Sequence, residues 1–261
     1  MDKRKIIYYT DELNDEFSTA QIKARTIDGN YVYCHNSAFK RFTRFFWYRI
    51  IATPVTFLYV KLFLHRRVFG KEKLKPFLKK GYFLYGNHTH DVGDAMTPTT
   101  LNFPQQNYCI VHANNVSMPI LGRLTPSFGA LPLPDTKDAY KSFISAIERR
   151  IGEGHTVVIY PEAHIWPYYT GIRPFTDVSF QYPVKLDAPV FCFTNTYQKR
   201  RLSKKPKTVT YIDGPFFADK ELSLRAQRKD LRDRVYSCMC ERAKNSNVEC
   251  IKYVKREEKN G

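Results

Sequence analysis

At 261 residues, the chain is long enough for one domain with a sizeable hydrophobic core. The 42 Lys and Arg residues outnumber the 25 Asp and Glu residues, and the resulting charge of +17 attracts polyanions such as anionic lipid headgroups, phosphorylated substrates, acidic proteins or nucleic acid. The six cysteines form no C-x-x-C pair, which argues against a zinc site or a disulfide framework. The first residues lack the uninterrupted apolar stretch of a signal peptide.

Residues 1–36 form a mixed, polar N-terminal extension. Residues 37–70 begin and end with basic side chains and are mostly apolar between them. This length would suit a bilayer span, but Arg49, Lys61 and a central Pro54 interrupt it. The interleaving of apolar and basic residues favours an amphipathic helical segment, of one or two kinked helices, lying in the membrane surface. The alternative is a helix packed on the protein's own core.

Short apolar runs alternate with helical patterns between residues 71 and 245. The expected strands are 82–85, 108–112, 128–133, 156–160, 189–194 and 208–212, and the expected helices are 95–103, 138–151, 175–185 and 219–244. This alternation predicts an α/β fold, and residues 246–261 form a basic tail.

Polar side chains follow directly on the first of these strands, where α/β proteins usually keep their chemistry. Asn87, His88 and His90 stand there, with Asp94 a few residues on. This composition predicts a histidine general base held by a carboxylate. A polar turn in which the histidines bond only to backbone is the alternative. The spacing does not match the His-x-His-x-Asp-His pattern of metallo-hydrolases, so no metal is expected.

Four segments, taken together and in this order, resemble the 1-acylglycerol-3-phosphate acyltransferase family. Together they cover about residues 80–200. The first segment is Asn87-His88 with Asp94, and the second is the stretch through Pro119, Gly122 and Gly129. The third is Tyr160-Pro161-Glu162 followed by Gly171-Ile172-Arg173-Pro174-Phe175, and the fourth is Ala188-Pro189-Val190. The resemblance implies a mixed, largely parallel sheet flanked by helices. It also implies that His88 is the base and Asp94 its partner, with His90 as the alternative base.

The chain departs from the family pattern at several positions. Five residues separate His88 from Asp94, where the family has four. Residues that would contact an acceptor phosphate are replaced by Pro134-Asp135, Ala163-His164 and Thr176-Asp177. Arg173 and Arg123 are the nearest candidates to take over that role, and surface charges are the alternative. The acceptor could therefore be something other than a glycerol phosphate.

The resemblance implies an enzyme of phospholipid biosynthesis at the cytoplasmic face of the membrane, peripheral or monotopic, with no cofactor. It would move an acyl group from acyl-CoA or an acyl carrier protein to a lysophospholipid or glycerol-phosphate-like acceptor. Asn87 and Glu162 would bind substrate, and backbone N–H groups around 92–94 would stabilise the oxyanion. The alternative is a non-catalytic lipid- or acyl-carrier-binding protein on the same fold. Nucleic acid is not expected as a partner, because no reading motif is present.

Overall fold

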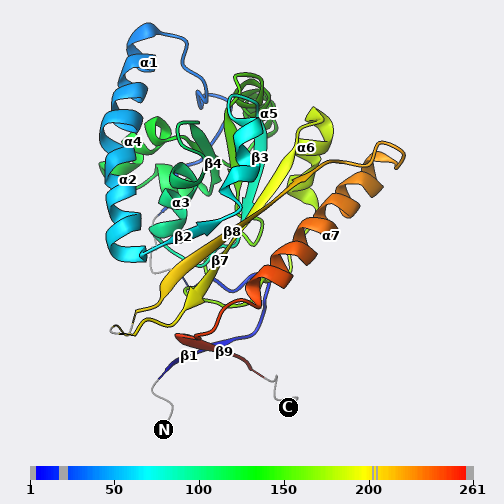
Figure 1. Ribbon diagram of the computed structural model, residues 1–261. Helices are drawn as coiled ribbons and strands as arrows, with labels where there is room; N and C mark the ends of the chain where they lie inside the picture. The colour runs from blue at the N-terminus through cyan, green and yellow to red at the C-terminus, as the bar shows by residue number, and fades with distance from the viewer. Residues whose placement is uncertain (1–3, 18–22, 202, 204, 257–261) are drawn as a thin grey trace, which may run out of the picture.

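The computed structural model describes residues 4–17, 23–201, 203 and 205–256. A seven-stranded sheet in the order β2-β8-β7-β3-β6-β4-β5 forms its centre (Figure 1). The strands are β2 (Arg67–Phe69), β3 (Tyr82–Gly86), β4 (Asn107–Val111), β5 (Ala130–Pro132), β6 (Thr156–Ile159), β7 (Val190–Gln198) and β8 (Lys207–Phe216). Neighbouring strands are parallel except β7 and β8. The prediction of a mixed, largely parallel sheet is confirmed.

Helices cover both faces of this sheet, which explains why its central strands read as continuous apolar runs. The helix α3 (Gly93–Asn102) and the 3-10 helix η3 (Lys71–Phe77) cover one face. The other face carries α5 (Lys137–Gly152), α6 (Gln181–Leu186) and α7 (Leu224–Ala243) (Figure 1). Short helical turns connect the strands: η4 (Ala113–Val116), α4 (Leu121–Leu124), η5 (Thr125–Phe128) and η6 (Val178–Phe180).

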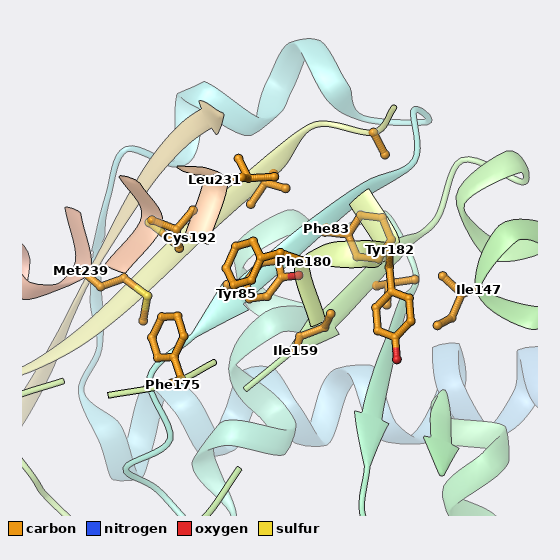
Figure 2. Packing of buried hydrophobic residues seen from close by; sticks show 14 of the residues in the cluster. Phe83, Tyr85, Ile147, Ile159, Phe175, Phe180, Tyr182, Cys192, Leu231 and Met239 are labelled. Carbon is orange, nitrogen blue, oxygen red and sulfur yellow. The ribbon is translucent and has the colours of Figure 1, made fainter. Parts of the chain in front are cut away.

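The larger part of the core lies between the sheet and α5, α6 and α7. Figure 2 shows Phe83 and Tyr85 of β3 among side chains from these helices, with Phe180 close to Tyr85. The Tyr85 and Phe180 rings stack with centroids 4.3 Å apart, and the Tyr85 hydroxyl donates to the Ser179 carbonyl at 3.0 Å. All residues of β3 are buried, so the strand that leads to the candidate site is held from both sides.

The apolar N-terminal segment forms a helical run made of α1 (Ala38–Phe45), η1 (Phe46–Ala52), α2 (Thr53–Tyr59) and η2 (Val60–Leu64). The stretches η1 and η2 are π-helical. The wider turn before Pro54 fits a residue that has no N–H to donate and whose ring would clash with an α-helical carbonyl. Within the described part of the chain, no helix combines the length and the apolar character needed to cross a bilayer.

Two terminal segments pair with each other outside the main sheet. The strands β1 (Lys5–Tyr9) and β9 (Ile251–Lys255) run parallel, with Lys5 opposite Ile251 and Tyr9 opposite Lys255. Part of the expected basic tail is therefore an ordered strand. Its partner lies at the other end of the chain, and no local pattern reveals such a pairing.

Candidate active site

The candidate site lies at the edge of the sheet where β3 and β6 both end. Tyr85 of β3 pairs with Ile159 of the parallel strand β6, so the residues that follow the two strands emerge side by side. His88 follows β3, and Tyr160 and Glu162 follow β6. This edge, formed by the carboxyl ends of parallel strands, is where ligands of open α/β sheets bind.

The His88 ring contacts the Asp94 carboxylate. The Nδ1 atom of His88 lies 2.9 Å from Oδ2 of Asp94. The same oxygen accepts the backbone N–H groups of Thr89 at 2.8 Å and His90 at 2.9 Å, so the carboxylate also closes the turn. Residues 91–92, between the two side chains, form an exposed turn. Asp94 lies in the first turn of α3, where the helix dipole favours a negative charge.

His90 is placed differently from His88, although it too lies close to Asp94 in sequence. Its ring packs edge-on against Tyr168 and Tyr197, with centroids 4.9 and 5.6 Å away. Burial lowers the pKa of His90, although the nearby Asp94 carboxylate acts in the opposite direction. The His90 Nε2 atom is buried and has no hydrogen-bond partner among the described residues. The bond to Asp94 comes from the His90 backbone.

Tyr160 supports both members of the His88–Asp94 pair. Its ring stacks on the His88 ring, with centroids 4.6 Å apart and planes inclined by 22°. Its hydroxyl donates to the backbone carbonyl of Asp94 at 2.5 Å. In the sequence, Tyr160 stands out only as part of the Tyr160-Pro161-Glu162 motif, which assigns it no function.

A half-buried arginine, Arg66, contacts the helix α3, whose first turn carries Asp94. Its guanidinium donates to the Thr100 hydroxyl at 3.2 Å and to the Thr97 hydroxyl, both on α3. Burial lowers the pKa of Arg66 to about 10, and Tyr160 and the Asp94 carboxylate oppose that shift. In the sequence, Arg66 is one of several basic residues at the end of an apolar segment. Nothing there distinguishes an arginine that contacts α3 from the exposed ones.

The Asn87 side chain, predicted to bind substrate, is hydrogen-bonded to the neighbouring strand β7. Its Nδ2 donates to the Asn195 carbonyl at 3.0 Å, and its Oδ1 accepts the Asn195 backbone N–H at 2.8 Å. Both ends of the amide are thus used by the neighbouring strand β7. Asn87 continues the β3–β7 pairing beyond the end of β3 and so fixes the position of His88.

Glu162 and Arg173 form a buried ion pair, with 3.3 Å between Oε2 and Nε. Burial raises the pKa of Glu162 to about 7, against the attraction of Arg173, and its Oε1 has no hydrogen-bond partner in the described part of the chain. Arg173 also donates to the backbone carbonyls of Glu162 at 3.0 Å, of Glu12 at 3.1 Å and of His164. Arg173, the predicted contact for an acceptor phosphate, thus donates to the loop that follows β6 and to the N-terminal segment.

The N-terminal segment closes over this loop. Trp166 is fully buried, and its indole N–H donates to the Asp15 carbonyl at 2.8 Å. Its ring packs against Tyr9 of β1 and stacks on Tyr253 of β9, with centroids 4.7 and 4.8 Å away. The guanidinium of Arg173 lies 4.9 Å from the Trp166 ring centroid. The paired strands β1 and β9 therefore hold the Glu162–Arg173 pair out of water.

Comparison with known proteins indicates a family and a fold. A sequence profile described as "Acyltransferase" matches residues 65–194, from the end of η2 into β7. The chain belongs to the acyltransferase family. Among solved structures, it is similar to the 1-acyl-sn-glycerophosphate (LPA) acyltransferase PlsC from Thermotoga maritima, with 17% identity and a TM-score of 0.57 over 80% of this chain and 89% of that chain. No curated protein sequence matches the chain.

Two further expectations concern Arg123 as a phosphate contact and the backbone N–H groups of 92–94 as oxyanion donors. Arg123 is exposed on α4, so the surface-charge interpretation describes it. The Asp94 backbone N–H donates to the His90 carbonyl at 3.1 Å and is not available to an oxyanion. The backbone N–H groups of Val92 and Gly93, at the start of α3, are the remaining candidates in the predicted stretch 92–94.

Proposed function

We propose that this acyltransferase moves a fatty acyl group from acyl-CoA or an acyl carrier protein to the hydroxyl of a lysophospholipid or a glycerol-phosphate-like acceptor. The similar PlsC structure is titled a 1-acyl-sn-glycerophosphate acyltransferase, which supports this class of acceptor. The observation that carries the proposal is the 2.9 Å contact between His88 Nδ1 and Asp94 Oδ2 at the open edge of the sheet.

The reaction uses the acceptor hydroxyl as nucleophile, so it needs no serine or cysteine of the protein. With Nδ1–H donating to Asp94, the Nε2 atom of His88 takes the proton of the hydroxyl as that oxygen attacks the thioester carbonyl. Asp94 stabilises the imidazolium, as the carboxylate of a catalytic triad does. The N–H groups of Val92 and Gly93 stabilise the oxyanion of the tetrahedral intermediate. When the carbon–sulfur bond breaks, His88 returns its proton to the leaving thiolate.

The helical run 38–64 would bring this site to the cytoplasmic surface of the membrane. Its buried face includes the polar residues Tyr48, Thr53 and Thr56, and α2 packs against α3. Its apolar side chains are mostly exposed instead: Phe39, Phe42, Phe45, Ile50, Val55, Leu58, Leu62 and Phe63. Soluble proteins rarely expose such a continuous apolar surface, and contact with lipid explains it.

The test is acyl transfer by purified protein from an acyl-CoA to a lysophosphatidate, followed by mass spectrometry. His88→Ala should lower kcat by about 10²–10⁴-fold. His35→Ala is the control, because it removes an exposed histidine from the segment before α1, away from the candidate site. Full activity in His88→Ala would overturn the proposal. Binding of lipid without turnover of acyl-CoA or acyl carrier protein would favour a non-catalytic binding protein.

A further inference from the structure

A cavity of about 270 Å³ lies beside the candidate active site and is used by none of the steps above. It lies between the end of η2, the turn that carries His90, the loop after β6 and the connection between β7 and β8. Its polar lining comes from Tyr59, His65, His90, Tyr168, Arg200 and Lys205. These residues are distant in sequence, so the fold itself assembles the cavity.

The lining of the cavity contains a polar atom without a partner. The His90 Nε2 atom is buried, with His90 9% exposed, and no described residue bonds to it. A buried polar atom without a partner costs free energy, so native proteins rarely keep one. The lowered pKa favours the neutral form of His90, whose ring keeps one N–H that can donate to an acceptor in the cavity.

The charge of the lining indicates which kind of ligand accepts this hydrogen bond. Arg200 and Lys205 form no ion pair with any described residue, and no Asp or Glu lines the cavity. Two carboxylates lie outside the lining: Asp94, which accepts the His90 backbone N–H at 2.9 Å, and Asp91, which acts to raise the pKa of Tyr59 and Tyr168. Two cations, two phenol hydroxyls and two imidazoles line a space that suits a phosphate group.

The backbone around the cavity is held in uncommon conformations. His65 has φ of 43° and Tyr168 has φ of 56°, both in the left-handed region that side chains other than glycine seldom adopt. Such strain is common at binding sites. The backbone N–H of Tyr168 also donates to the Thr89 carbonyl at 3.0 Å, which ties the cavity wall to the turn between His88 and His90.

We infer that this cavity binds the phosphate of the acceptor lipid, an inference that rests on the proposed function and names the acceptor's headgroup. The exposed Leu62 and Phe63 at its rim continue the apolar face of the helical run, so a lipid would reach the cavity headgroup first. The Cα atoms of His88 and His90 are at most about 7 Å apart, because one residue separates them. With the phosphate in the cavity, we expect the neighbouring acceptor hydroxyl to reach the His88 ring. The cavity would take over the phosphate-binding role expected of Arg173, whose donors bind the protein's own backbone.

The experiment compares two double variants of the full-length protein. Arg200→Ala/Lys205→Ala removes both cations of the cavity. Lys199→Ala/Arg201→Ala removes the same charge from the same connection, at residues that are exposed and outside the cavity lining. Each is assayed with a lysophosphatidate and with the matching monoacylglycerol as acceptor, and with acyl-CoA as donor.

The cavity variant should raise KM for the lysophosphatidate by at least about tenfold, because it loses charge-assisted hydrogen bonds to phosphate. Its kcat, its KM for acyl-CoA and its KM for monoacylglycerol should match those of the control variant. Titration calorimetry with a lysophosphatidate in which hydrogen replaces the acceptor hydroxyl should show the same loss of affinity without any turnover.

Two results would overturn the inference. Equal KM values for the lysophosphatidate in both double variants would mean that the cavity does not bind the acceptor's phosphate. A rise in the KM for acyl-CoA instead would assign the cavity to the donor's phosphates. If the wild-type protein transferred no acyl group but bound the analogue through Arg200 and Lys205, the proposed function would fail and the phosphate site would stand.

Discussion

The Tyr160 ring lies against the His88 imidazole, with centroids 4.6 Å apart and only 22° between their planes. The Tyr160 hydroxyl meanwhile bonds to the Asp94 carbonyl at 2.5 Å. One side chain directly after β6 therefore restrains the ring of His88 by stacking and the backbone of its partner by a hydrogen bond. This arrangement fixes the imidazole in the orientation that general-base catalysis requires.

The two contacts of Tyr160 can be separated by mutation. Tyr160→Phe keeps the stacked ring and loses only the bond to Asp94, so kcat should fall by less than about tenfold. Tyr160→Leu also loses the stacking and should lower kcat by about 10–100-fold, because His88 is then free to rotate. Steady-state acyl transfer with circular dichroism as a folding check measures both effects. Equal activity of the two variants would show that the ring does not position His88.

The Asp94 carboxylate serves both the turn and His88, and two substitutions distinguish these roles. Asp94→Asn keeps an oxygen for the N–H groups of Thr89 and His90 but loses the charge, so kcat should fall by up to about 10⁴-fold at nearly native stability. Asp94→Ala should lose similar activity and, in addition, about 1–3 kcal/mol of unfolding free energy, because two buried N–H groups lose their acceptor. Urea unfolding of both variants is the measurement. An Asp94→Asn variant with wild-type kcat would contradict a role for the charge.

Much of the main sheet was predictable because its strands are short apolar runs bounded by turn residues. The expected strand 82–85 is observed as Tyr82–Gly86, and the expected helix 138–151 as Lys137–Gly152. The bounds of some other elements were less predictable. The expected strand 128–133 is only Ala130–Pro132, because a 3-10 turn occupies the residues before Gly129. The expected helix 175–185 is only η6 and α6.

The candidate site was predictable where residues are close in sequence and unpredictable where they are not. The contact of His88 with Asp94 spans six positions, and a motif can indicate it. The carbonyl of Glu12 that binds Arg173 is 161 positions away, and the partner of β9 lies at the opposite end of the chain. Sequence alone shows Arg173 as a free cation. Only the fold shows that its donors are used.

The buried Glu162 predicts a dependence of stability on pH. Its pKa is raised from 4.5 to about 7, so the folded protein keeps a proton that the unfolded chain releases. The unfolding free energy should therefore fall as the pH rises from about 4.5 to 7, by at most about 3 kcal/mol. Glu162→Gln should remove this slope, and Glu241→Gln, at an exposed position of α7, should keep it. Urea unfolding at several pH values tests this, and a slope unchanged in Glu162→Gln would contradict it.

The exposed apolar face of the helical run predicts binding to lipid vesicles. Phe42 of α1 is 64% exposed and Phe45 is 57% exposed, so their replacement should not disturb the core. Phe42→Glu/Phe45→Glu should weaken binding to anionic vesicles by at least about 100-fold, since each buried Phe contributes about 1.5–3 kcal/mol. Leu224→Glu is the control, because Leu224 is 69% exposed at the start of α7 and lies outside the run. Sedimentation with vesicles measures the bound fraction, and an equal loss in the control would show that the run does not contact lipid.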